Sequence, residues 1–123
     1  MERAWIGLGA LAGLSAVAMS AAAAHALASR LDPTSLSAIR AAVQMQGWHA
    51  LALIFCGLWA ARGGALAHAA AGCFTAGLLL FCAGVYANAM ASVQLRMVAP
   101  AGGTLLMLGW GFLAVSALAA RRR

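Results

Sequence analysis

Apolar residues form four long stretches along the chain, and short polar segments separate them. The stretches run from about Ala4 to Leu27, Ala41 to Ala61, Ala65 to Met90, and Val98 to Ala120. Each reaches the roughly 20 residues that a helix needs to cross a hydrocarbon core about 30 Å thick. Because a backbone inside lipid must satisfy its own hydrogen bonds, we expect every stretch to be helical. The pattern predicts an all-α integral membrane protein, with residues 1–123 as a single domain and four transmembrane helices in an up-down-up-down bundle, at about 4–28, 38–61, 65–90 and 99–120.

The composition also indicates that the protein lies in a lipid bilayer. Of the 123 residues, 65% are hydrophobic and only 8% are charged, whereas soluble domains carry about 25% charged residues. A folded protein in water needs more charged residues on its surface than this chain contains. The net charge of +6 comes with eight basic residues, all Arg, which flank the apolar stretches. That placement is typical of membrane spans, so we expect membrane lipids as partners and no nucleic acid.

The segments between the stretches contain recognisable helix boundaries. In LDPTSLS, Asp32 is expected at the N-cap and Pro33 at the first helical position. ARGGA at 61–65 predicts a tight turn between the second and third helices, and ASVQLRMVAP at 91–100 links the third to the fourth. Pro100 would then begin the last helix, where no N–H is needed.

The arginines predict an orientation. With four spans, the N-terminus, the 62–64 turn and the C-terminus share one side of the membrane, and that side holds five Arg against three on the other. The five are Arg3, Arg62 and Arg121 to Arg123, and the three are Arg30, Arg40 and Arg96. The positive-inside rule then predicts a multi-pass protein with both termini in the cytoplasm.

Glycines recur at spacings that favour close helix packing. GLGALAG at 7–13 differs by one residue from a dinucleotide-binding motif and lies inside an apolar stretch, so its Gly-x-x-x-Gly pair is interpreted as a packing face. The last stretch has two glycines seven residues apart. Helix-packing positions are therefore expected at Gly9, Gly13, Gly102, Gly103 and Gly109.

Five polar residues are expected to gather in the outer leaflet. Gln46 and His49 lie on one face of the second stretch, in its outer half, while the others lie near the outer ends of the first and third stretches. The candidate polar cluster is His25, Gln46, His49, Tyr86 and Asn88. Buried polar groups in a membrane tend to face the protein interior.

Several functions are open for this cluster. The groups can hydrogen-bond one another to join the helices, bind a small solute, a lipid or a proton through the histidines, ligate haem or a metal, or contact another protein. His49 is expected about 8 Å deeper than His25, which suits a single iron poorly. A structural zinc site needs four ligands. We therefore expect no cofactor and no metal.

The remaining chemistry does not favour an enzyme. The only acidic residues are Glu2 and Asp32, and the sequence contains no Ser/His/Asp set, no carboxylate pair and no phosphate-binding loop. Cys56, Cys73 and Cys82 lack metal-ligand spacing and are expected to act as small apolar packing residues. His68, at the start of the third stretch, is expected at the membrane interface.

The sequence resembles the YgdD-like family of small four-span membrane proteins, a domain of unknown function with bacterial and eukaryotic members. The resemblance rests on LGALAGLSAVAMSAAAAHAL, QGWHALAL, FCAGVYANA and APAGGTLLMLGW, which together cover nearly the whole chain. Departures from the family pattern are the alanines at 21–24, Met45 and Cys82 to Gly84, which stay small or apolar. The resemblance implies a bacterial inner-membrane (plasma-membrane) protein and supplies no activity.

These observations lead to a functional hypothesis with two alternatives. We expect a small non-enzymatic membrane protein that is an accessory subunit of a membrane complex, with a membrane-protein partner or a second copy of itself. The first alternative is binding or transport of a small solute, a lipid or a proton by the polar cluster. The second is binding of haem or a metal.

Overall fold

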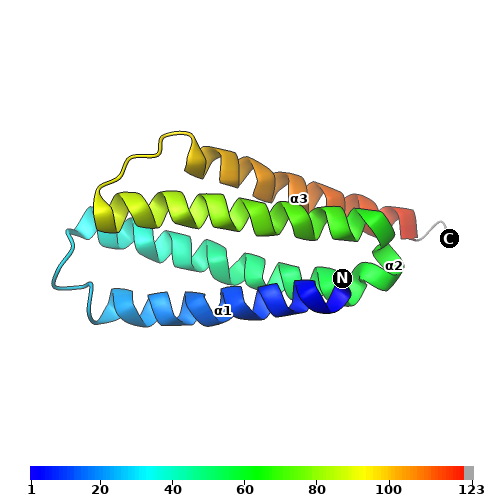
Figure 1. Ribbon diagram of the computed structural model, residues 1–123, viewed down its shortest axis with the longest axis horizontal. Coiled ribbons are helices and arrows are strands. Elements are labelled where there is room, and N and C mark those ends of the chain that lie inside the picture. The colour runs from blue at the N-terminus through cyan, green and yellow to red at the C-terminus, as the bar shows by residue number, and fades with distance from the viewer. Residues whose placement is uncertain (121–123) are drawn as a thin grey trace.

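The computed structural model describes residues 1–120, which form three helices and their connections. Helix α1 covers Glu2–Ala24, α2 covers Pro33–Ala91, and α3 covers Val98–Ala120. The helical segments lie side by side along one axis, so the molecule is an elongated helical bundle (Figure 1). The N-terminus, the bend in α2 and the end of α3 lie at one end, and the connections 25–32 and 92–97 lie at the other.

The prediction of four helices is wrong. The second and third apolar stretches belong to a single helix, α2, which is 59 residues long. Within it only Gly64 leaves the helical conformation, with φ 57° and ψ −144°. A positive φ is readily available to glycine because it has no Cβ. One residue therefore reverses the chain where a separating loop was expected, and α2 folds back as two antiparallel arms: the first arm (33–63) and the second arm (65–91) (Figure 1).

The start of α2 follows the prediction. Asp32 is the N-cap, with its carboxylate accepting from the Ser35 N–H at 3.1 Å and from the Ser35 hydroxyl at 2.6 Å, and Pro33 occupies the first turn. These bonds satisfy a backbone donor that the helix itself leaves free. The prediction of Asp32 as cap is confirmed.

The other helix boundaries differ slightly from the expected ones. Helix α1 ends at Ala24, before the expected limit of 28, and His25 follows as its C-cap. Helix α2 ends at Ala91, and its C-cap, Ser92, has a left-handed φ of 54°. Helix α3 begins at Val98, so Pro100 lies inside its first turn, where it still interrupts no helical hydrogen bond.

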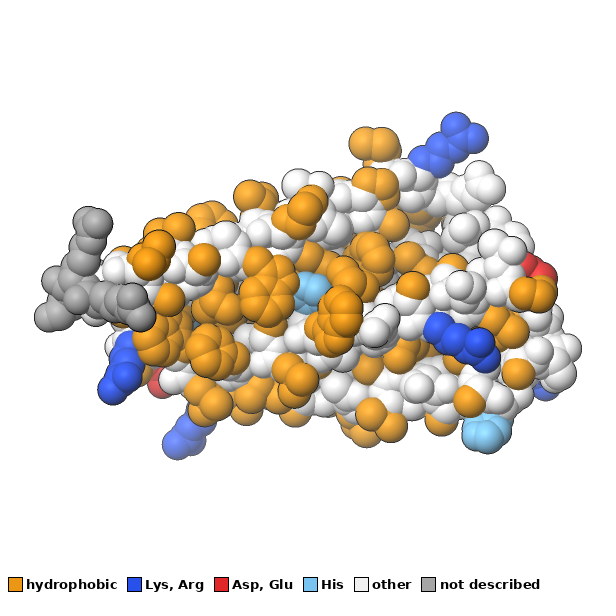
Figure 2. Space-filling view, turned by 180° about the vertical axis from the view of Figure 1, so that it is seen from behind, with side chains coloured by type: hydrophobic (Ala, Val, Ile, Leu, Met, Phe, Trp, Pro, Cys, Tyr) orange, Lys and Arg blue, Asp and Glu red, His pale blue; other side chains and the backbone are white. Residues whose placement is uncertain are grey.

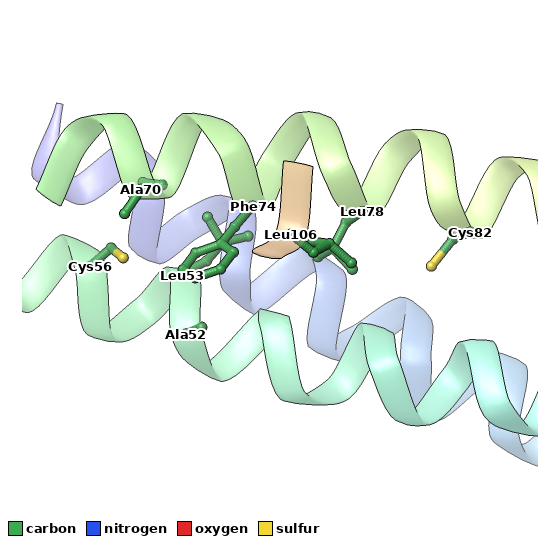
Figure 3. Close-up of a cluster of buried hydrophobic side chains, with 9 residues drawn as sticks. Ala52, Leu53, Cys56, Ala70, Phe74, Leu78, Cys82 and Leu106 are labelled. Carbon is green, nitrogen blue, oxygen red and sulfur yellow. The ribbon is translucent and has the colours of Figure 1, made fainter. Parts of the chain in front are cut away.

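The two arms of α2 form the centre of the bundle. Helices α1 and α3 both pack against α2, and over residues 1–120 they do not pack against each other. Between the arms and α3 lies a buried apolar cluster (Figure 3) made of Ala52, Leu53, Cys56, Ala70, Ala71, Phe74, Leu78, Cys82 and Leu106. Cys56 and Cys82 are free thiols packed among these side chains.

Several glycines stand where backbones approach closely. A Cβ added at Gly9 would lie 2.7 Å from the Ala50 carbonyl oxygen, and one added at Gly102 would lie 2.7 Å from the Gly77 carbonyl oxygen. A Cβ at Gly109 would lie 2.6 Å from the Phe74 ring. These distances are too short for any larger residue unless the neighbouring helix moves at Gly9 and Gly102, or the Phe74 ring moves at Gly109.

The other two glycines of the expected packing set have more room. A Cβ at Gly13 would lie 3.8 Å from the Ala50 Cβ, and one at Gly103 would lie 4.0 Å from the Phe81 ring, both ordinary contact distances. Gly57 was not among the expected positions, yet a Cβ there would lie 2.7 Å from the Glu2 carbonyl oxygen. Close packing is therefore confined to particular glycines and does not extend to every glycine of a pattern.

The outer surface of the bundle is largely apolar. Leu11, Leu14 and Val17 of α1 are each more than half exposed, as are Leu51 and Leu58 of the first arm. Figure 2 shows apolar side chains along the length of one face, with Arg side chains toward its ends. All three helices are long and apolar enough to cross a membrane.

Candidate functional site

The five residues of the expected polar cluster do not meet in one place. Gln46 and Tyr86 are hydrogen-bonded to each other, whereas His49 belongs to a separate contact with α3. His25 lies beyond the end of α1 and is exposed, and the Asn88 side chain is also exposed. The expected cluster is thus divided between two interior polar sites, and two of its residues lie outside both.

The first interior site is centred on Gln46, which is only 8% exposed. Its Nε2 donates to the Ala12 carbonyl oxygen at 3.0 Å and to the Ser15 hydroxyl at 2.6 Å, both on α1. Its Oε1 accepts from the Tyr86 hydroxyl of the second arm at 2.8 Å. One side chain of the first arm therefore connects α1 to the second arm.

The orientation of the Gln46 amide follows from these partners. A backbone carbonyl can only accept, so the side facing Ala12 must be the nitrogen. The oxygen then faces Tyr86, whose hydroxyl must be the donor. Ser15 donates its own hydrogen to the Ala12 carbonyl oxygen at 3.0 Å, which leaves it free to accept from Gln46.

A pocket of about 530 Å³ lies beside this network, between α1 and the second arm. The first arm contributes Gln46 and Leu53 to it. The polar side chains that line it are Ser15, Gln46, Thr75 and Tyr86, and the other lining residues are Leu8, Leu11, Ala12, Met19, Leu53, Leu78, Leu79, Cys82 and Ala83. Leu11 and Leu79 are 63% and 68% exposed, so the rim of the pocket reaches the apolar outer surface.

The second interior site is centred on His49, which is 3% exposed. Its Nδ1 lies 2.6 Å from the Met45 carbonyl oxygen, and its Nε2 accepts from the Trp110 indole N–H of α3 at 3.0 Å. Because a carbonyl can only accept, Nδ1 carries the proton and the ring is the neutral Nδ1–H tautomer. The Phe74 and Trp110 rings pack around it, with centroids 5.5 and 5.8 Å away.

Both nitrogens of His49 are therefore used in internal hydrogen bonds. A metal ligand needs a free nitrogen lone pair, and a proton carrier needs a second polar group to exchange with. Among residues 1–120, no group of three or more His, Cys, Asp and Glu side chains could hold a metal ion. The arrangement suits a structural contact between α2 and α3.

Two further tryptophan contacts join the helices near the end where α2 bends. Trp5 donates its indole N–H to Nδ1 of His68 at 2.8 Å, and Trp59 donates to the Ser116 hydroxyl at 3.0 Å. His68 was expected at the membrane interface, but its hydrogen bond with Trp5 was not expected. In the described part of the chain, no buried side-chain nitrogen or oxygen lacks a hydrogen-bond partner.

Ser15 and Trp110 complete the two interior sites and were not among the expected site residues. Ser15 is the only hydroxyl in the middle of α1, which is a weak signal, and Trp110 in the middle of α3 resembles a lipid-facing aromatic. Neither residue reveals its partner, because the partner depends on how each helix is rotated about its axis.

Comparison with known proteins connects this helical bundle to a family. A family model described as a protein of unknown function, DUF423, matches residues 19–103. A UPF0382 membrane protein of Haemophilus influenzae is 35% identical over 111 residues, covering 89% of this chain and 90% of the relative. UPF0382 membrane proteins of Staphylococcus epidermidis and Staphylococcus aureus are 30% and 29% identical, each over about nine-tenths of both chains. No solved structure matches the chain. With a matching family model over most of its length and a relative of this similarity, the chain belongs to the DUF423 family of membrane proteins of unknown function.

Proposed function

We propose that this protein binds a single-chain amphiphile, taken up from the bilayer, in the pocket between α1 and the second arm of α2. The observation that carries this proposal is the pocket itself, about 530 Å³ in volume, with mostly apolar walls and a small polar group at one side. Pockets of about 300 to 1,000 Å³ with this lining are the usual form of small-molecule sites. A rim on the apolar surface gives an alkyl chain a route that never crosses water.

The competing functions have less support. Haem, metal or proton binding would need His49, whose two ring nitrogens are engaged with Met45 and Trp110. An accessory role in a larger complex remains a prediction, because large apolar side chains are exposed on all three helices and none of these surfaces is distinguished from one that lipid would cover. The sequence has no pair of carboxylates that could act as a catalytic acid and base. We therefore propose a non-enzymatic binding protein.

We also propose a multi-pass protein with both termini in the cytoplasm, located in the bacterial inner membrane as the resemblance to the YgdD-like family implies. The support is the Arg count along the sequence, five on the side of the N-terminus against three on the other, although Arg121 to Arg123 of those five lie outside the described residues. A reporter that functions only in the cytoplasm should be active when it is fused to the C-terminus. Activity of a periplasm-dependent reporter at that position would contradict the orientation.

Photolabelling can test the amphiphile site. The purified protein in nanodiscs is labelled with an octadecyl probe that carries a diazirine near its methyl end, and labelling displaced by excess octadecanol is taken as specific. We expect specific labelling on peptides of α1 and of the second arm that line the pocket. Labelling that excess octadecanol does not displace, spread over all exposed apolar surfaces, would refute the site.

A pair of alanine variants sharpens this test. Ala83 lines the pocket and is exposed, and Ala76 is also exposed on the same arm but does not line the pocket. Ala83→Phe should fill the pocket and remove specific labelling, while Ala76→Phe should leave it unchanged. Equal labelling of the two variants would contradict the proposed location.

A further inference from the structure

The polar side of the pocket offers an unusually one-sided set of hydrogen-bonding groups. From it we infer that the site selects an amphiphile whose head is a neutral hydroxyl donor, such as a long-chain or isoprenoid alcohol. This inference rests on the proposed binding function and specifies the chemical class of its ligand. The support is a count of donors and acceptors on the four polar side chains that line the pocket.

The donors are all used inside the protein. Both hydrogens of the Gln46 amide go to α1, one to the Ala12 carbonyl oxygen and one to Ser15. The Ser15 hydroxyl hydrogen also goes to the Ala12 carbonyl oxygen, and the Tyr86 hydrogen goes to Gln46 Oε1. The fourth polar side chain, Thr75, donates to the Ala71 carbonyl oxygen of its own helix at 2.8 Å.

The oxygen atoms of these side chains still have unused lone pairs that can accept hydrogen bonds. A hydroxyl has one hydrogen and two lone pairs, and an amide oxygen has two lone pairs. Gln46 Oε1 and Ser15 Oγ each have one lone pair engaged, and the lone pairs of Tyr86 Oη have no partner among the hydrogen bonds of the described residues. The pocket therefore presents oxygen acceptors and no free donor.

This asymmetry decides which head groups fit. A ketone, an ether or a phosphate oxygen brings only acceptors, so it would lose its hydrogen bonds to water or to lipid head groups and gain none. A hydroxyl can donate to Gln46 Oε1, Ser15 Oγ or Tyr86 Oη. A charged ammonium could also donate, but neither acidic residue of the chain, Glu2 or Asp32, lines the pocket to neutralise it.

Matched competitors test the inference. Octadecanol and octadecyl methyl ether share one chain and differ in the single hydroxyl hydrogen, so each is used to displace the octadecyl diazirine probe from the protein in nanodiscs. We expect the ether to need about a tenfold higher concentration than the alcohol to displace the same fraction of the probe, as the loss of one hydrogen bond predicts. Equal potency, or a stronger ether, would overturn the inference. Displacement by neither compound would instead overturn the proposed binding function.

A variant of Gln46 tests the source of the selectivity. Gln46→Met removes the acceptor of the Tyr86 hydroxyl, whose hydrogen then becomes free to donate into the pocket. The preference for the alcohol should fall to within about twofold of equality, because an ether now finds a donor. Gln44→Met is the control, since Gln44 is exposed on the same arm and does not line the pocket. A full alcohol preference in Gln46→Met protein that elutes as wild type in size-exclusion chromatography would refute this origin.

Discussion

Trp110 of α3 donates its indole N–H to Nε2 of His49 in the first arm of α2, at 3.0 Å, near the middle of both helical segments. The bond fixes the imidazole in one tautomer, since its other nitrogen faces the Met45 carbonyl oxygen. It also explains why a 3% exposed histidine can lie among apolar side chains, because each polar atom has a partner. The histidine acts as a connection between helices.

Removing the donor should therefore destabilise the bundle. Trp110→Phe keeps an aromatic ring but leaves His49 Nε2 buried without a partner. We expect the free energy of unfolding to fall by about 1 kcal/mol. This value lies between the average contribution of an interhelical hydrogen bond in a membrane and the cost of a buried unpaired polar group. The measurement is thermal unfolding in detergent. Trp48→Phe is the control, because Trp48 is 55% exposed. Equal melting temperatures for the two variants would contradict the structural role of the bond.

The contact between α3 and the second arm depends on Gly102. A methyl group there would lie 2.7 Å from the Gly77 carbonyl oxygen and 2.8 Å from the Phe81 Cα, so the two backbones would have to separate. Gly102→Ala should cost about 1 to 3 kcal/mol, as expected for overpacking.

The matched control for Gly102 is another glycine of the same helix. A Cβ at Gly111 meets nothing within 4 Å, so Gly111→Ala should be neutral or slightly stabilising through helix propensity. Both variants are compared by unfolding in the same detergent. If Gly102→Ala proves as stable as Gly111→Ala, the close approach is not a determinant of packing.

The bend of α2 depends on Gly64. With φ 57° and ψ −144°, this residue has a backbone conformation that a residue with a Cβ adopts only at a cost. Gly64→Ala should destabilise the fold by about 1 to 3 kcal/mol. Gly72→Ala, on the second arm where a Cβ meets nothing within 4 Å, should not. Unfolding of both variants in detergent is the test, and equal stability would show that the reversal tolerates a side chain.

The cap of α2 predicts a pH dependence. Hydrogen bonds from the Ser35 side chain and backbone lower the pKa of Asp32 below its usual 3.8. Because the folded pKa lies below the unfolded one, the cap contributes stability above the unfolded pKa and loses it as the pH falls through the folded value. The melting temperature of the wild type should therefore decline as the pH is lowered from about 5 to about 3.

Two variants isolate the Asp32 carboxylate in that titration. Asp32→Asn keeps a good N-cap without an ionisable group, so most of the decline should disappear. Glu2→Gln removes the only other acidic side chain and should leave the decline in place. A wild-type decline that persists in Asp32→Asn would assign the pH dependence to another group.

The sequence alone determined that this is a helical membrane protein and that one helix begins at Asp32 and Pro33. Lengths near 20 apolar residues leave few alternatives in lipid, and Asp32 with Pro33 marks a helix start by local chemistry alone. It also selected Gln46 and His49 as interior, because polar groups are costly on a lipid-facing surface. What the sequence could not reveal was that Gly64 would reverse one continuous helix, since a glycine pair is equally typical of a loop.

The tertiary structure decided which polar groups meet. Gln46 and His49 are three residues apart, so they point about 60° apart around the same helix. In this bundle that angle turns one toward α1 and the other toward α3, and the expected single cluster becomes two sites. The rotation of each helix, which places Ser15 and Trp110 opposite them, depends on contacts such as Gly9 with Ala50 and Gly109 with Phe74. Those contacts join residues tens of positions apart, and no local pattern in the sequence contains them.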